Sequence, residues 1–207
     1  MDNAFIVTGL RYTRQGSLKV ELNGEYIGEV DPLVFEFSVG DELSKEEADA
    51  ARDLARRFSA QKKALGSLAV TSYSKAGLKR KLIQKGVEPQ IADESVEYFS
   101  AKGYIDDNEY AKNKAAVMHS RKNFGRRRIR FELMKLGVGG DTVDQVIESL
   151  PPDIEALRRI LSDFDKDKLI DRAEMNRFWQ RSMRQGFYSD DIREALSEVS
   201  DEDYYDE

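Results

Sequence analysis

A repeated, glycine-centred pattern constrains the fold of this chain more than any other feature of its 207 residues. Gly86, Gly137 and Gly186 lie 51 and 49 residues apart, and the residues around each of them follow one pattern. This pattern is typical of a helix that ends in a left-handed glycine, a short turn and a second helix. A period of about 50 residues indicates a stacked array, because each unit buries its apolar face against a neighbour. The matching positions are Leu78, Ile129 and Phe178 eight residues before the glycine, Leu82, Leu133 and Ser182 four before it, and Ala92, Val143 and Ile192 six after it.

A further helix precedes each of these units, at about 46–70, 107–122 and 152–164. We therefore predict a mainly α fold: three tandem three-helix repeats that form an elongated curved array, preceded by a small N-terminal β-hairpin or sheet. The predicted segments are the hairpin region at 1–43, repeat 1 at 44–104, repeat 2 at 105–150, repeat 3 at 151–199 and an acidic tail at 200–207.

The N-terminal segment has the alternating pattern of β structure. Asn23-Gly24 separates the run Leu18–Leu22 from Tyr26–Val30, and this dipeptide between alternating runs predicts a hairpin. The run Phe5–Tyr12 is a candidate third strand. A sheet of this size is marginal alone, so it needs another element to pack against. Ser44 and Glu47 form a capping-box pattern that predicts the start of the first long helix.

The net charge of −6 conceals an uneven distribution. Residues 187–207 carry nine acidic side chains against Arg193 alone, whereas residues 1–186 sum to +2. The window 110–131 contains eight Lys and Arg residues and no acidic one, and the window 72–87 contains five and none. Local fields depend on such clusters over about 8–10 Å and hardly on the total. The acidic total therefore does not exclude a polyanionic partner.

Several classes of protein are disfavoured by what the chain lacks. Without cysteine it can form no disulfide, thiolate zinc site or iron–sulfur cluster. No apolar run approaches the roughly 20 residues that span a bilayer, so we expect no membrane partner. The residues Met1–Ala4 lack the layout of a signal peptide, so we expect a cytoplasmic protein.

No catalytic constellation is apparent, so we expect neither an enzyme nor a cofactor. His119 is the single histidine, and we interpret it as an ordinary surface or packing residue of a helix. Asp106 and Asp107 precede a predicted helix and are interpreted as its N-terminal cap and first-turn charge.

One segment has the acidic spacing of a calcium-binding loop. Asp163, Asp165, Asp167, Asp171 and Glu174 occupy positions 1, 3, 5, 9 and 12 of such a loop. Lys168 stands at position 6, where the sharp turn requires glycine, and its ammonium would lie beside the cation. We therefore do not expect a metal site here.

The basic clusters recur at equivalent places in the repeats. Lys75–Lys81 begins the middle helix of repeat 1, and Arg126–Arg130 begins that of repeat 2. Leu78 with Leu82, and Ile129 with Leu133, form the opposing buried stripes. Arginine binds both phosphate and carboxylate, so DNA and an acidic protein surface remain alternative partners. The candidate binding residues are Arg126, Arg127, Arg128, Arg130, Lys75, Lys79, Lys81, Arg121 and Lys122.

Repeat 2 also contains the residues that make this chain similar to a known family. Gly103–Ala111, followed by Phe124–Leu133 and the Lys-Leu-Gly turn at 135–137, resembles the RecX family of RecA regulators. Ser74, Leu78, Leu82, Lys85 and Gly86 resemble the first repeat of that family, and Gly186–Ile192 its third; Tyr73 and Gly77 depart from the usual arginine and glutamate. The resemblance covers about residues 60–199.

The resemblance implies a non-enzymatic, mostly inhibitory regulator of the bacterial RecA recombinase. Family members lie in the groove of the RecA–DNA filament and limit its growth and activities, in DNA repair and the SOS response. The expected partners are the RecA filament and, through weak and salt-dependent contacts, single- and double-stranded DNA; we expect a monomer. Two alternatives remain: a helical DNA-binding protein that acts without RecA, and a structural helical adaptor whose basic residues are merely solvated.

Overall fold

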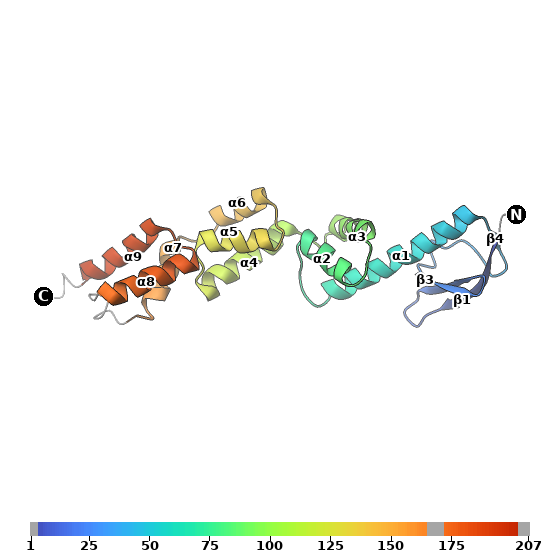
Figure 1. Cartoon of the computed structure of the whole chain (residues 1–207), viewed down its shortest axis with the longest axis horizontal. Coiled ribbons are helices and arrows are strands. Elements are labelled where there is room, and N and C mark those ends of the chain that lie inside the picture. The colour runs from blue at the N-terminus through green and yellow to red at the C-terminus, as the bar shows by residue number, and fades with distance from the viewer. Residues whose placement is uncertain (1–3, 165–171, 203–207) are drawn as a thin grey trace. The chain divides into compact units, whose positions relative to one another are not determined.

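The computed structural model describes residues 4–164 and 172–202, and within these ranges it contains four strands and nine helices (Figure 1). The strands are β1 (Phe5–Tyr12), β2 (Leu18–Leu22), β3 (Glu25–Val30) and β4 (Glu42–Leu43). The helices are α1 (Lys45–Leu68), α2 (Lys75–Gln84), α3 (Pro89–Ala101), α4 (Asp107–Lys122), α5 (Arg126–Lys135), α6 (Gly140–Glu148), α7 (Asp153–Leu161), α8 (Arg172–Gln185) and α9 (Ser189–Glu202). The predicted mainly α fold with a small N-terminal sheet is confirmed.

The chain divides into two compact units. Unit 1 comprises Met1–Tyr73 and Gly77–Ile105, and unit 2 comprises Ser74–Ala76 and Asp106–Glu207. Unit 1 therefore contains the sheet together with most of repeat 1, and unit 2 contains repeats 2 and 3. The sheet and the first repeat share a unit because one helix, α1, packs against both.

The sheet of unit 1 is antiparallel, in the strand order β3-β2-β1-β4. Asn23 and Gly24 both have positive φ, of 51° and 79°, as the predicted two-residue hairpin requires. Strand β4 pairs Leu43 with Phe5 and was not apparent from the sequence, because two residues carry no periodicity. Val7, Val20 and Leu22 are buried in one cluster with Ala48, Ala51 and Ala55 of α1. Helix α1 is thus the element against which the small sheet packs, as expected from the sequence.

Helix α1 begins with the predicted capping box. The Ser44 hydroxyl accepts a hydrogen bond from the Glu47 amide at 3.2 Å, and the Glu47 carboxylate accepts one from the Ser44 amide at 2.8 Å. Farther along the helix, Ala60 and Ala64 are buried with α2 and α3 in the core of repeat 1. Alanine suits both surfaces, because its small side chain lets the sheet and the helices approach closely.

The glycine caps that define the repeat are present in all three copies. Gly86, Gly137 and Gly186 have φ of 77°, 85° and 90°, in the left-handed region that favours glycine. The aligned residues Leu82, Leu133 and Ser182 are completely buried. Ser182 therefore occupies a true core position of repeat 3, and the alignment of this repeat is confirmed despite its polar side chain.

Two features of the C-terminal part that were noted in the sequence, the calcium-like pattern and the acidic tail, include residues outside the described ranges. Asp165, Asp167, Lys168 and Asp171 of the calcium-like pattern lie outside the described residues, whereas Asp163 and Glu174 pair with Arg181 and Arg177. Ser200–Glu202 of the acidic tail belong to α9, and residues 203–207 lie outside the described residues. Within the part of the chain that the structure describes, no cluster of acidic or histidine side chains suits a metal ion, and no helix is long and apolar enough to cross a membrane.

The contact between β3 and α1 gives a test of unit 1. A Cβ atom on Gly28 would lie 2.8 Å from that of Ala55, and the φ of Gly28 is 136°. Gly28→Ala should therefore lower the free energy of unfolding by about 2 kcal/mol or more, through backbone strain and overpacking together. Chemical denaturation followed by circular dichroism measures this loss.

Gly40→Ala is the matched control, because Gly40 also has positive φ but has open space where a Cβ would lie. Gly40→Ala should lower the free energy of unfolding only by the contribution of backbone strain. Equal losses in the two variants would contradict tight packing between β3 and α1.

Candidate binding surface

The N-terminus of α5, where the arginine cluster begins, lies against the turn between α8 and α9. The amide of Gly125 donates to the carbonyl of Gln185 at 2.9 Å, and the amide of Arg127 donates to that of Gly186 at 3.2 Å. A Cβ atom on Gly125 would come within 2.6 Å of the Gly186 backbone. This segment is therefore the joint at which repeat 2 meets repeat 3 inside unit 2.

Two arginine side chains strengthen this joint by binding the C-terminal carbonyls of α8. Arg127 donates to the carbonyl of Met183 at 3.0 Å, and Arg128 donates to that of Arg184 at 3.1 Å. Arg128 also lies 4.0 Å from the centre of the Phe124 ring. Cations are favourable at a helix C-terminus, where unpaired carbonyls carry partial negative charge. These two residues consequently have a structural role that their charge alone did not indicate.

Arg126 and Arg130 differ from each other in environment. Arg126 is half-buried and donates to the carbonyls of Leu150 and Pro151, at 2.9 and 3.3 Å. Arg130 is exposed and forms an ion pair with Asp144 of α6. A spacing of four residues predicts that Arg126 and Arg130 share one face of the helix, but packing against the turn before α7 half-buries Arg126.

Hydrogen bonds to carbonyls orient a guanidinium without neutralising it. Arg127 and Arg128 are held by uncharged acceptors, and Arg128 also by Phe124, so their charge is not balanced there by an acid, whereas Arg130 is compensated by Asp144. The start of α5 therefore presents fixed positive charge, as a surface that attracts an anionic partner requires.

The remaining predicted cations occupy several environments. Arg121 and Lys122 are exposed in the last turn of α4, and Lys122 lies 5.8 Å from the centre of the Phe124 ring. Lys79 pairs with Asp93 at 2.7 Å, and Lys81 is half-buried, both within unit 1. Lys75 belongs to unit 2, at the first turn of α2. The equivalent placement of the basic residues at the starts of α2 and α5 is confirmed, while the role of these residues in binding stays a prediction.

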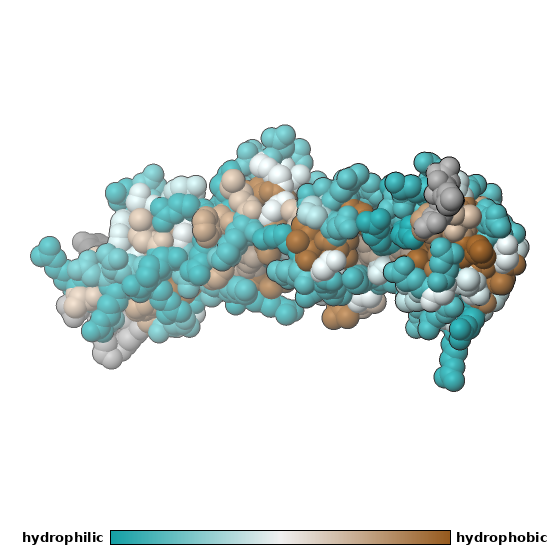
Figure 2. All heavy atoms as spheres, turned by 45° about the vertical axis from the view of Figure 1, so that its right-hand side comes forward, coloured by the Kyte–Doolittle hydropathy of each residue, from teal (hydrophilic) through white to brown (hydrophobic). Residues whose placement is uncertain are grey.

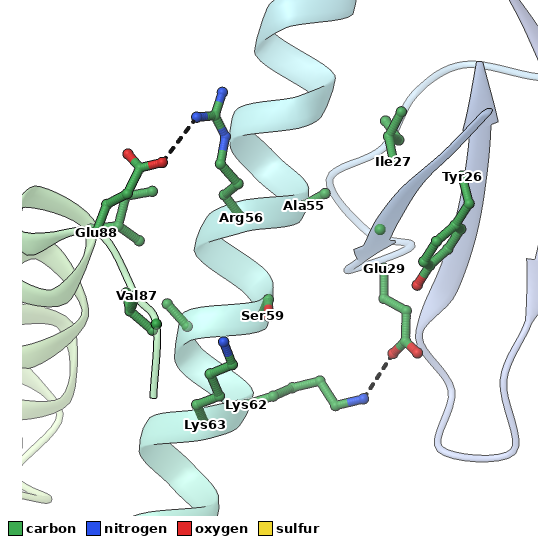
Figure 3. A pocket seen from close by; sticks show the side chains of 14 residues that line it. Tyr26, Ile27, Glu29, Ala55, Arg56, Ser59, Lys62, Lys63, Val87 and Glu88 are labelled. Carbon is green, nitrogen blue, oxygen red and sulfur yellow. Dashed lines mark hydrogen bonds and ion pairs between the residues drawn. The ribbon is translucent and has the colours of Figure 1, made fainter. Parts of the chain in front are cut away.

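A cavity of about 560 Å³ in unit 1 was not predicted (Figure 3). Strand β3 lines one side and α1 and the turn at Val87 and Glu88 the other. Lys62 pairs with Glu29 at 2.7 Å, and Arg56 pairs with Glu88 at 3.3 Å. Two of the three cations that line the cavity are thus paired with acids, and the third, Lys63, donates to the Lys85 carbonyl at 3.1 Å.

Comparison with known proteins relates this geometry to a family. A family model described as RecX, second three-helix domain, matches residues 106–147, which span α4 to α6. Regulatory protein RecX of Trichlorobacter lovleyi is 31% identical over 140 residues, 64% of this chain and 90% of that protein. Regulatory protein RecX of Xanthomonas campestris pv. campestris strain B100 is 33% identical over 147 residues, 68% of this chain and 89% of its own. The chain belongs to the RecX family.

Solved structures of RecX proteins share the fold. A crystal structure of regulatory protein RecX superposes with a TM-score of 0.77 at 18% identity and covers 94% of this chain and 99% of its own. The crystal structure of RecX from Lactobacillus salivarius gives 0.64 at 17% identity and covers 70% and 97%. The resemblance noted in the sequence is therefore confirmed for family and fold.

In this RecX-family chain, a buried polar cluster that was not apparent from the sequence lies beside the arginines. Asp153 begins α7, and its buried carboxylate accepts a hydrogen bond from the Arg126 amide at 3.2 Å. His119 is buried as well, and its Nε2 lies 3.8 Å from Asp153 Oδ1. The interpretation of His119 as a packing residue agrees with its burial. Sequence spacing does not mark Asp153, because its partners His119 and Arg126 lie on other helices, 34 and 27 residues away. Asp106, by contrast, is the predicted cap, since its side chain accepts from the amides of Asn108 and Glu109.

Burial controls the protonation of this cluster. It raises the pKa of Asp153 from 3.8 to about 6, against the opposing hydrogen bond from the Arg126 amide. Burial also lowers the pKa of His119, with Arg159 acting in the same direction. Folding thus strengthens proton binding at Asp153, so its contribution to stability is full below pH 3.8 and is lost as the pH rises through about 6. His119 acts oppositely, since its contribution is lost as the pH falls below its ordinary pKa of 6.5.

Asp153→Asn isolates the contribution of the carboxylate. The amide oxygen can still accept the Arg126 hydrogen bond, and the variant avoids a buried negative charge at neutral pH. Relative to the wild type, its free energy of unfolding should rise between pH 4 and pH 7, as measured by denaturation across that range.

Asp141→Asn serves as the control, because Asp141 is an exposed first-turn acid of α6. A wild-type pH profile for Asp153→Asn would contradict the assigned pKa shift.

Proposed function

We propose that this chain is a non-enzymatic regulator, mostly an inhibitor, of the bacterial RecA recombinase, which it binds in the groove of the RecA–DNA filament. Membership of the RecX family supports this proposal, since its relatives carry the name regulatory protein RecX. The resemblance of residues 103–137 to RecX proteins implies the RecA partner. Binding there would limit filament growth and lower the activities of the filament.

The single observation that carries the proposal is the basic start of α5 inside the matched second three-helix domain. Arg127 and Arg128 are held in place by α8, so a partner meets positive charge that is already ordered. Preorganised groups lose less conformational entropy on binding. Repeated helical units also allow several weak contacts to act together through effective concentration.

The direct test adds the protein to a RecA ATPase assay that depends on single-stranded DNA. We expect ATP hydrolysis to fall as the protein approaches a stoichiometric ratio to RecA, because shorter filaments contain fewer active protomers. Unchanged hydrolysis at a stoichiometric ratio would argue against RecA regulation.

DNA binding without RecA is the second candidate, and the charges of Arg127 and Arg128, which bind carbonyls and no acid among the described residues, favour it. Affinity for naked DNA should then fall steeply with salt, through counterion release. Binding to naked DNA together with no effect on RecA would support this candidate over the first.

The basic surface can be tested without disturbing the joint between repeats. Arg121 and Lys122 are exposed at the end of α4, whereas Arg126 and Arg128 hold main-chain carbonyls. Arg121→Glu/Lys122→Glu should weaken binding to the RecA filament several-fold at low salt and less at high salt, since exposed charges are screened. Fluorescence anisotropy across a salt series measures this change.

Arg14→Glu/Lys19→Glu makes the same charge change at exposed positions of unit 1 and should leave binding nearly unchanged. If both double variants behave like the wild type, the basic residues are merely solvated and the helical adaptor is favoured.

A further inference from the structure

The outer face of α5, which is turned away from the core, carries two exposed apolar side chains beside its arginines. Ile129 and Leu133 are buried, while Phe131 and Met134 are 64% and 56% exposed. Residues three and four apart are neighbours on a helix, so Arg127, Phe131 and Met134 lie together on the side opposite the core. Arg130 flanks them. Two large apolar side chains therefore form one patch within a helix that is otherwise rich in cations.

Exposed apolar side chains are common singly, but a contiguous pair ringed by cations is less so. The visible surface in Figure 2 is mostly hydrophilic, with hydrophobic patches of limited size. Aromatic residues, methionine and arginine are the types enriched in protein interfaces. Residues that dominate binding energy are often aromatic side chains that fill a pocket on the partner. The composition of this face therefore matches a protein-binding surface.

We propose that the outer face of α5, comprising Arg127, Arg130, Phe131 and Met134, docks a protein surface that offers an apolar pocket rimmed by carboxylates, with Phe131 as the anchor. This inference rests on the proposed function and specifies which part of the basic region recognises protein. The pocket would remove Phe131 and Met134 from water, and the rim would face the cations around them.

The apolar pair in the patch favours an acidic protein over the phosphates of DNA. Phe131 and Met134 have no donor for a phosphate, whereas an apolar pocket on a protein would remove both side chains from water. An acidic rim around that pocket is attracted by the charge of the arginines, while the apolar pair gains contact area. Met134 gains from an apolar pocket but offers no ring on which a base can stack.

The test compares Phe131→Ala with the wild type for binding to two probes: RecA filaments assembled on single-stranded DNA, and the same DNA alone. Loss of an interface anchor should weaken filament binding by about tenfold or more. Binding to DNA alone should stay within about twofold, because the charge is unchanged. Met134→Ala should produce a smaller loss of the same kind. Circular dichroism melting checks that folding is retained, as the exposure of both side chains predicts.

Tyr12→Ala is the matched control, because Tyr12 is an exposed aromatic residue of unit 1, and it should bind like the wild type. Filament binding by Phe131→Ala within about twofold of the wild type would overturn the inference and leave the proposed function standing. Equal losses toward the filament and DNA alone would also overturn it, because the face would then contact DNA. A wild-type protein that fails to bind the filament overturns the proposed function, and this inference with it.

Discussion

The close approach of Gly125 to the turn at Gly186 is the contact on which unit 2 depends. No side chain fits between these two segments, so the amides of Gly125 and Arg127 reach the carbonyls of Gln185, the last residue of α8, and of Gly186 directly. The side chains of Arg127 and Arg128 bind the carbonyls of Met183 and Arg184. The C-terminus of α8, which would otherwise leave acceptors unpaired, is thus satisfied in part by the basic start of α5, the equivalent helix of the preceding repeat. The same few residues thus join two repeats and concentrate charge.

The joint between repeats 2 and 3 both holds the repeats together and presents positive charge, because a carbonyl orients a guanidinium but leaves its charge intact. Arg127 and Arg128 are ordered by α8 and remain positive, whereas Arg130 is paired with an acid and Arg126 is largely withdrawn into the protein. The residues of one motif therefore contribute unequally to any surface. Phe131 and Met134 complete that surface on the outer side of α5.

Local patterns predicted most of the elements correctly. The capping box at Ser44, the turn at Asn23-Gly24 and the three glycine caps each lie where neighbouring residues dictate the backbone. Strand β4, the burial of Asp153 and the half-buried position of Arg126 were not predictable in this way. Each depends on a partner distant in sequence, and periodicity contains no information about such a partner.

By itself, the sequence determined the class of fold, the number of repeats and the place of the basic clusters within them. These follow from periodicity and turn chemistry, which act over a few residues. Only the tertiary structure decided that α1 packs against both the sheet and repeat 1, and that Arg127 and Arg128 bind carbonyls of α8. Only packing decided that Asp153 is buried, with a pKa of about 6, and that Phe131 is left outside. The physical reason is that burial and hydrogen-bond partnership arise when distant segments meet.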